Sequence, residues 1–236
     1  MSEPYLKTHC VVLKRLPFKD VDAHMILFCH DLGKVMALAK GVGKPTSKLS
    51  SVLEVGNLLE VELYDGKAGY TLLSANQLEG FSRRYSSYEA LLTSAYICEF
   101  VDAATEKAMQ QDIIYDLLVK MLSAMVNDNI VEIRLRFVWE YLLRSGYASA
   151  DTEDFLQLFF FHWNVSVFNF YQQGLVDEVY SFLCQPLEHM RLTSFRLSKK
   201  ARTLLKQILM RLLRKHLMLS IKSEKLLDAA TRQFYS

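Results

Sequence analysis

The hydrophobic pattern of this chain changes its period near Ser82, and this change limits the fold more than any other feature. Before that point, short stretches such as Leu58–Tyr64 alternate apolar and polar residues, whereas after it apolar residues recur every three or four positions. Alternation is typical of a half-buried strand, and the longer period is typical of an amphipathic helix. We therefore predict an α+β protein with a β domain over residues 1–82 and an all-helical domain over residues 83–236. No long flexible linker is expected between them.

Five stretches of the first domain have the pattern of strands and end at turn signals such as Asp65-Gly66. The predicted strands are His9–Arg15, His24–His30, Lys34–Lys40, Leu58–Tyr64 and Tyr70–Leu78. Short strands separated by frequent turns indicate a small antiparallel barrel. A barrel of five strands fits an oligonucleotide-binding (OB) fold, although the strand count alone does not separate that fold from an SH3-like barrel.

The second domain begins with three predicted helices, at residues 88–100, 113–125 and 130–145. Ser86 or Ser87 is positioned to cap the first. Its apolar stripe includes Tyr88 and Leu91, and the stripe of the second helix begins at Ile113. These stripes are expected to face the core.

The remainder of the chain is less regular until Ser198. A helix is predicted over Leu175–Leu183, and Ser198 caps a long helix. The buried stripe of that helix is predicted to be Ala201, Leu205, Ile208, Leu209 and Leu212, with Leu204 at its margin. Residues 148–175 fit either a buried helix or a hairpin, and their aromatic and β-branched residues favour some strand in the second half, ended by Gly174.

The composition indicates a cytoplasmic protein with a substantial core. Apolar residues make up 51% of the chain, but no apolar run approaches the roughly 18 to 20 residues that span a bilayer. The first five residues lack the apolar segment of a secretory signal. We interpret the four scattered cysteines, Cys10, Cys29, Cys98 and Cys184, as reduced and buried.

Charge is distributed unevenly along the chain. Residues 1–82 carry nine basic and nine acidic side chains, residues 83–190 carry seven and fifteen, and residues 191–236 carry twelve and two. The last segment therefore has a net charge of +10. Such an asymmetry indicates a surface that faces a polyanion. The alternative is that the basic end packs against the acidic middle.

The stretch Gly33–Lys48 holds four lysines and no acidic residue. Its first half alternates like a strand, and its second half contains Gly41, Gly43 and Pro45, which mark a turn or an exposed loop. It does not fit a nucleotide-binding P-loop, because Pro45 follows the lysine where serine or threonine is required. Clustered lysines on such a loop suit contact with a phosphate backbone, and the alternative is an ordinary solvated loop.

Catalysis has no support in the sequence. His24, Cys29 and His30 fall on one predicted strand without a partner acid, and no other histidine or cysteine has the spacing of a catalytic or metal-binding motif. We therefore predict that the protein is not an enzyme.

Several stretches together resemble the RecO family of bacterial recombination and repair mediators. They are Ala39-Lys40-Gly41 with the basic loop to Lys48, Leu53-Glu54, Leu58–Tyr64, Arg136-Phe137 with Leu142-Leu143 and Gly146-Tyr147, and His216-Leu217 with Ile221-Lys222-Ser223. They occur in the family's order and at about its spacing, and they cover most of the chain.

The resemblance implies an N-terminal OB domain and a helical C-terminal domain in a cytoplasmic, nucleoid-associated protein. It implies binding of single- and double-stranded DNA and annealing of complementary strands. The implied protein partners are the acidic, hydrophobic tail of the single-strand DNA-binding protein, RecR and, indirectly, RecA. No membrane partner is expected.

The candidate DNA-binding residues are the basic side chains of the loop, of the first strand and of the C-terminal helices. They are Lys14, Arg15, Lys34, Lys40, Lys44, Lys48, Lys199, Lys200 and Lys222. Tyr64, Tyr70 and Phe18 are candidate platforms for base stacking, with a place in the core as the alternative for each.

The candidate site for the partner's tail is Arg136 with Phe137, Tyr141 and Leu142. A cation beside apolar side chains is what a terminal carboxylate and a preceding aromatic side chain require. The alternative is that Phe137 and Leu142 belong to the core and that Arg136 pairs with Glu132 or Glu140.

One departure from the family concerns metal. Many RecO proteins carry two Cys-x-x-Cys pairs just after the Gly-Tyr motif, but no cysteine follows Gly146-Tyr147 until Cys184. Tetrahedral zinc with nitrogen and sulfur ligands cannot be built from so few residues. We predict no zinc and no other cofactor, and we expect the aromatic cluster from Phe155 to Phe170 to hold the region by packing.

Two functions of different classes follow. The first is a DNA-binding mediator that anneals strands and helps to load a recombinase onto single-stranded DNA coated by the single-strand DNA-binding protein. The second is a scaffold for protein partners that uses its basic surface for assembly.

Overall fold

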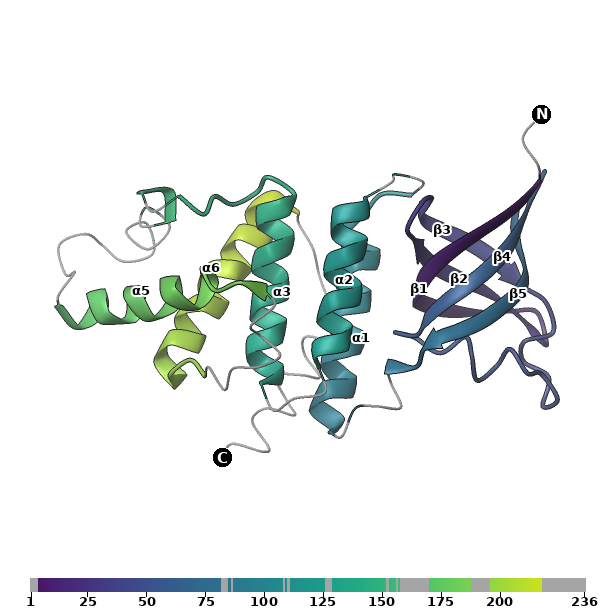
Figure 1. The fold of residues 1–236 in the computed structure, drawn as a ribbon, viewed down its shortest axis with the longest axis horizontal. Coiled ribbons are helices and arrows are strands. Elements are labelled where there is room, and N and C mark those ends of the chain that lie inside the picture. Colours follow the sequence, from purple (N-terminus) through teal and green to yellow (C-terminus); the bar gives the residue numbers. More distant parts are fainter. Residues whose placement is uncertain are drawn as a thin grey trace. The chain divides into compact units, whose positions relative to one another are not determined.

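The elements follow one another in the predicted order, with five strands first and helices after them (Figure 1). The computed structural model describes residues 4–81, 85, 87–107, 109, 111–125, 129–151, 153–155, 157, 170–187 and 196–217. Internal contacts divide the chain into a barrel unit (residues 1–126 and 221–236) and a helical unit (residues 127–220). The barrel unit thus continues past residue 82, where the domain boundary is predicted.

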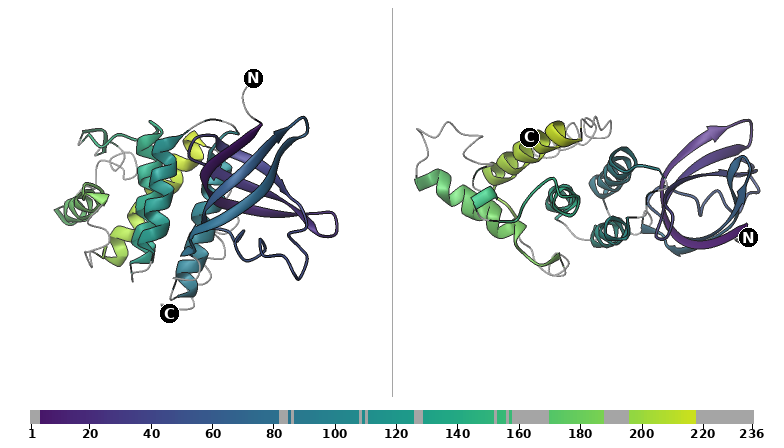
Figure 2. Two further views of the ribbon diagram at one scale, coloured as in Figure 1. Left: turned by 45° about the vertical axis from the view of Figure 1, so that its right-hand side comes forward. Right: turned by 90° about the horizontal axis from the view of Figure 1, so that it is seen from above.

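The five strands close into a barrel. They are β1 (Tyr5–Phe18), β2 (Asp22–Cys29), β3 (Gly33–Ala39), β4 (Leu58–Gly66) and β5 (Gly69–Glu79). Their order around the barrel is β1-β2-β3-β5-β4, with β4 also paired to β1. The right-hand view of Figure 2 looks into the closed barrel. β3 and β5 run parallel, and the other pairs are antiparallel. This is the arrangement of an OB-type barrel, and the predicted α+β fold class is confirmed.

The apolar residues that alternate along β4 point into the barrel, and the polar residues between them point outward. Leu59, Val61 and Leu63 of β4 point inward and are at most 1% exposed. β1 departs from alternation, because Val11, Val12 and Leu13 are all buried. A register shift between Val12 and Lys14 bends the strand there, and the helix α1 packs against β1, so the outer side of this strand is covered as well.

Two helices complete the described part of the barrel unit: α1 (Tyr88–Ala104) and α2 (Asp112–Ala124). Ser87 caps α1 as predicted, since its hydroxyl accepts a hydrogen bond from the Ala90 amide at 3.1 Å. Tyr115 of α2 lies against the barrel, with its ring centroid 6.3 Å from that of Phe28.

The predicted apolar stripes of α1 and α2 are wrong at three positions. Tyr88, Leu91 and Ile113 are 61%, 46% and 58% exposed. The buried face of α1 is instead rotated toward small polar side chains, including Ser94. A Cβ atom on Gly56 would lie only 2.9 Å from the Ser94 hydroxyl, so α1 approaches the barrel too closely there for a large side chain.

The helical unit contains α3 (Ile130–Arg144), α5 (Phe170–Leu183) and α6 (Lys199–His216) among its described residues. The prediction for α6 is confirmed: the Ser198 hydroxyl accepts from the Ala201 amide at 3.2 Å, and the predicted stripe is buried. Residues 170–174 begin α5, so the chain there is helical, and Gly174 lies inside a helix where an end was predicted. Some strand was favoured for the second half of residues 148–175, and the part of it before residue 170 lies outside the described residues.

The cysteines are all free, and three of the four are buried as predicted; Cys184 is exposed. Cys10 and Cys29 face each other directly across β1 and β2. The His30 amide donates to the His9 carbonyl at 3.0 Å, which makes the cysteines a non-hydrogen-bonded pair, in which Cα atoms are about 4.5 Å apart. That distance is within the range of a disulfide.

We therefore predict that hydrogen peroxide links Cys10 to Cys29, two thiols and one peroxide giving one disulfide and two waters. A hydrogen bond to Cys29 and burial raise the pKa of the Cys10 thiol, so the reaction is expected to be slow until the barrel opens locally. Peptide mapping under non-reducing conditions measures the product, with the Cys184→Ser variant used to remove the exposed thiol. Recovery of both buried thiols unmodified after the variant is oxidised in dilute denaturant would contradict the prediction.

Candidate nucleic-acid interface

The basic loop connects β3 to β4 and is fastened to the barrel at its start. The Gly41 amide donates to the Asp22 carboxylate at 2.7 Å, and the Gly43 amide donates to the Val21 carbonyl at 2.7 Å. Gly41 has a φ of 65°, which favours glycine, and a Cβ atom on Gly43 would lie 3.2 Å from the Val21 backbone. These contacts explain the two glycines of the Lys40–Lys44 segment.

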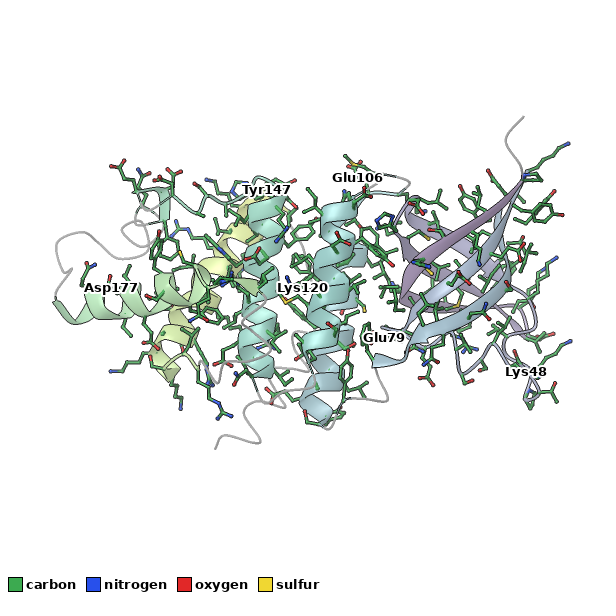
Figure 3. The ribbon with its side chains drawn as sticks, viewed as in Figure 1. Lys48, Glu79, Glu106, Lys120, Tyr147 and Asp177 are labelled. Carbon is green, nitrogen blue, oxygen red and sulfur yellow. The ribbon has the colours of Figure 1, made fainter. Side chains whose placement is uncertain are left out.

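Three of the predicted loop cations are exposed: Lys40, Lys44 and Lys48. None of the three forms an ion pair with any residue that the structure describes. Figure 3 shows Lys48 on the part of the loop that projects from the barrel. Their charges are therefore available to a polyanion.

Arg15 lies beneath this loop. Its guanidinium donates to the Val42 carbonyl at 3.4 Å and to the Ser50 hydroxyl at 3.5 Å. The side chain is half-buried, so it joins two points of the loop to the end of β1. Arg15 thus has a positioning role beside its predicted contact with DNA.

Lys14 and Lys34 are arranged differently from the loop lysines. Both pair with Asp102 of α1, with nitrogen–oxygen distances of 3.4 Å for Lys14 and 3.5 Å for Lys34. The Lys34 side chain is 10% exposed, and its ammonium also donates to the Asp102 carbonyl. These two lysines therefore fasten α1 to the barrel, and their predicted contact with DNA would compete with that role.

Aromatic rings lie at two places on the barrel surface. Tyr64 is 39% exposed and packs against Tyr5, with ring centroids 5.5 Å apart. Tyr5 was not among the candidates, although it pairs directly with Tyr64 across β1 and β4. Phe18 is half-buried against His24 at 4.3 Å, with the Lys19 ammonium 5.2 Å from the Phe18 ring centre. Tyr70, half-buried, packs against the barrel core.

The predicted cations of the helical unit are only partly within the described residues. Lys199 and Lys200 are exposed in the first turn of α6. Lys222 lies outside the described residues. The position of Lys199 and Lys200 at a helix N-terminus is unfavourable for cations, which is consistent with selection for something other than helix stability.

The four candidates for binding the partner's tail are buried. Phe137, Tyr141 and Leu142 are at most 3% exposed, and so is Arg136. Arg136 pairs with Glu140, with its Nη2 2.8 Å from Oε1. The structure thus shows the alternative in which Phe137 and Leu142 belong to the core and Arg136 forms an ion pair within α3. Binding of a tail by these side chains stays a prediction, and it would require them to become exposed.

Arg136 also holds the end of α5. Its two terminal nitrogens donate to the backbone carbonyls of Phe182 and Gln185, the second at 2.7 Å. These carbonyls belong to the last turn of the helix and the residues after it, where helical partners are absent. Burial lowers the pKa of Arg136, and Glu140 opposes that effect, so the guanidinium keeps its charge.

Two carboxylates hold the start of α6, a role that was not predicted for either of them, although Glu132 was named as a possible partner of Arg136. Glu132, 3% exposed, accepts from the Leu197 amide at 3.3 Å and from Arg202 at 2.7 Å. Glu178 accepts from the Ser198 amide and hydroxyl. Negative charge is favourable at a helix N-terminus. The one local signal for Glu132 was its place, like that of Glu140, among the apolar residues of α3, and no such signal pointed to Glu178 of α5.

No candidate metal site appears within the described residues. No three His, Cys, Asp or Glu side chains are close enough there to hold a metal ion. His30 and Asp31 form an exposed pair at 2.7 Å, which raises the pKa of His30 and lowers that of Asp31. The absence of zinc stays a prediction, which metal analysis of the purified protein tests.

The geometry defines a class of protein. It is an OB-type barrel, followed by helices, whose β3–β4 loop presents lysines that form no ion pair with any residue described in the structure. Among the described helices, none is long and apolar enough to cross a membrane.

The chain belongs to the RecO family. Residues 1–81 match the family model described as "Recombination protein O N terminal", and residues 85–236 match the one described as "Recombination protein O C terminal". The resemblance seen in the sequence is therefore confirmed.

The curated relatives have low sequence identity to this chain. A DNA repair protein RecO of Dehalococcoides mccartyi (strain 195) is 29% identical over 149 residues, which cover 62% of this chain and 59% of the relative. The DNA repair protein RecO of Clostridium novyi is 28% identical over 144 residues, covering 60% and 56%. That of Salinibacter ruber is 26% identical over 139 residues, covering 58% and 52%. The similarity thus spans less than two thirds of each relative.

The different roles of Lys34 and Lys40 give a prediction on stability. Replacing Lys34 by glutamine removes the contacts with Asp102 and is expected to lower the free energy of unfolding by about 1–3 kcal/mol. The same change at exposed Lys40 should stay within about 0.5 kcal/mol of the unchanged protein. Urea unfolding monitored by circular dichroism measures both, and equal stability of the two variants would show that the Asp102 contacts contribute nothing.

Arg136 and Arg144 provide a second matched pair, because both contact Glu140. Arg136→Ala removes the buried partner of Glu140 and of two carbonyls. We therefore expect the free energy of unfolding to fall by about 3–5 kcal/mol. Arg144 is 35% exposed, and Arg144→Ala should cost less than about 1 kcal/mol. Chemical denaturation of both variants checks this, and a similar small loss in each would argue against the structural role of Arg136.

Proposed function

We propose that this protein is a DNA-binding recombination mediator without enzymatic activity. It anneals complementary strands and helps a recombinase to load onto single-stranded DNA coated by the single-strand DNA-binding protein. The observation that carries the proposal is the set of exposed, unpaired lysines on the fastened β3–β4 loop of an OB-type barrel. The family and the printed names of the relatives, DNA repair protein RecO, support a role in DNA repair and recombination.

The lysine loop supports binding that is tolerant of sequence. Each phosphate that a lysine neutralises releases counterions, and this gain does not depend on which base is present. The loop is anchored at Gly41, Gly43 and, through Arg15, at Val42 and Ser50, so its backbone loses little further conformational entropy when the lysines bind DNA. A protein that neutralises two strands in this way lowers their mutual repulsion and promotes annealing.

The proposed partners follow from the family. They are single- and double-stranded DNA, the C-terminal tail of the single-strand DNA-binding protein, RecR and, indirectly, RecA. The proposed location is the bacterial cytoplasm, on the nucleoid. The tail is proposed to bind the helical unit, where Arg136 would act by shaping the fold around α5.

Charge reversal on the loop tests the proposal. Lys44→Glu is expected to weaken binding of labelled single-stranded DNA about tenfold at low salt, and Lys40→Glu/Lys44→Glu to weaken it further. In a salt titration, the double variant should lose about 1.4 from the slope of log affinity against log salt, because each phosphate contact on a single strand contributes about 0.7.

Lys107→Glu is the matched control for Lys44→Glu, since Lys107 is an exposed lysine of the same unit outside the loop. It should leave the slope unchanged. If Lys44→Glu and Lys107→Glu reduce affinity equally, the loop acts as ordinary charged surface and the mediator function loses its support.

The scaffold function remains the second candidate, because Lys14, Lys34 and Arg15 show that part of the basic surface serves assembly of the fold. Strand annealing by the loop variants separates the two functions. If the protein is a scaffold, the loop variants should lose partner binding while strand annealing is unchanged. If it is a mediator, they should lose strand annealing and keep partner binding.

A further inference from the structure

A cavity of about 730 Å³ opens beside the turn that follows α3. Pockets of roughly 300–1,000 Å³ accommodate small molecules or single groups of larger ligands. Its lining comes from the turn at Gly146 and Tyr147, from the segment after that turn, and from the C-terminal half of α6. All of the lining residues belong to the helical unit.

The turn places Tyr147 firmly at the cavity. Gly146 has a φ of 74°, and its amide donates to the Leu143 carbonyl at 3.1 Å while the Tyr147 amide donates to the Leu142 carbonyl at 2.8 Å. These two bonds form a Schellman motif. The Tyr147 ring lies 5.3 Å from the His216 ring at an interplanar angle of 31° and remains 37% exposed (Figure 3).

The floor and the rim of the cavity differ in polarity. Ile208 and Leu212 are 3% and 5% exposed and continue the buried stripe of α6. Arg211 and Lys215, one helical turn apart, carry positive charge at the edge, where Asp154 is the one acidic lining residue. The cavity therefore offers an apolar surface, a ring and cations together.

The charge of α6 indicates the class of ligand. This helix holds seven lysine and arginine residues and no acidic residue over its 18 positions. Arg202 near the start of the helix is paired with Glu132, but Arg211, Arg214 and Lys215 follow within five positions at its end. A ligand with one carboxylate needs a single cation, whereas such a run of cations suits a chain of phosphates. Exposed aromatic rings beside such cations are the usual platform for bases of a single strand.

We infer that this cavity is a subsite for one nucleotide of single-stranded DNA, with the base against Tyr147 and the apolar floor. The adjoining phosphates contact Lys215 and Arg211. The inference rests on the proposed function, and it assigns to the helical unit a DNA contact of its own, separate from the loop of the barrel.

Cross-linking and binding test the inference with the full chain. A single-stranded oligonucleotide that carries 4-thiothymidine is irradiated with the protein, and the attached peptide is identified by mass spectrometry. Attachment within residues 146–157 or 208–216 is expected. Tyr147→Ala should weaken binding about five- to tenfold, the lower range for loss of one stacked base, and Lys215→Gln should lower the salt slope by about 0.7.

The chain offers a control for each variant. Tyr88→Ala removes a ring of α1 that is more exposed than Tyr147, at 61% against 37%. Lys107→Gln removes an exposed lysine of the barrel unit that does not line the cavity. Both should change affinity by less than about twofold. Circular dichroism of the four variants confirms that each is folded, and cross-linking of the unchanged protein gives a result that does not depend on any variant.

The outcomes also separate this inference from the proposed function. If Lys44→Glu weakens DNA binding while Tyr147→Ala equals Tyr88→Ala and no cross-link maps to the cavity, the function stands and the subsite is overturned. If Tyr147→Ala instead abolishes binding of a peptide with an acidic, hydrophobic tail and leaves DNA binding intact, the cavity is a peptide site and the inference is wrong.

Discussion

The buried ion pair between Arg136 and Glu140 is the interaction on which the helical unit depends. Removing a guanidinium and a carboxylate from water is costly, and their attraction offsets this only when the remaining hydrogen-bonding groups are satisfied. Arg136 meets that condition by donating to two carbonyls at the end of α5. Two further carboxylates hold the start of α6. Glu178 of α5 accepts a hydrogen bond from the Ser198 amide, and Glu132 of α3 accepts one from the Leu197 amide. Polar groups inside α3 thus position both neighbouring helices.

Helices α3 and α5 also pack around Phe155, in the stretch after Gly146-Tyr147 where the resemblance leads us to expect the cysteine pairs of many RecO proteins. Phe155, which follows the position where those pairs would begin, is 2% exposed. Its ring lies 5.8 Å from Trp139 of α3 and 5.0 Å from Tyr180 of α5. Packing of Phe155, as predicted from the aromatic cluster, and the Arg136 contacts join the same two helices. The rest of that cluster, up to residue 169, lies largely outside the described residues.

Local signals made most of the fold predictable, and tertiary contacts decided what was not. Ser87 and Ser198 were identified as caps because the reason for a cap lies within four residues of it. The five strands followed from alternation and turns. The exposed face of α1 was misjudged because it depends on Gly56 of a distant loop, and no local pattern records that contact. The distant contacts of α3 have the same cause: Arg136 donates to the Phe182 carbonyl and Glu132 accepts from Arg202, which lie 46 and 70 positions away, whereas the Arg136–Glu140 pair is local and was among the alternatives.

The candidate site shows why a count of lysines overstates the surface available to DNA. Lys34 and Lys40 lie on the same basic stretch, yet Asp102 neutralises the first and nothing described neutralises the second. Arg202 is similarly taken by Glu132, although it belongs to the strongly basic end of the chain. Counterion release requires a cation whose charge is not already compensated in the folded protein. A mediator that must hold two strands therefore needs cations at places where the fold supplies no acid, and among the described residues the lysines of the β3–β4 loop meet that condition.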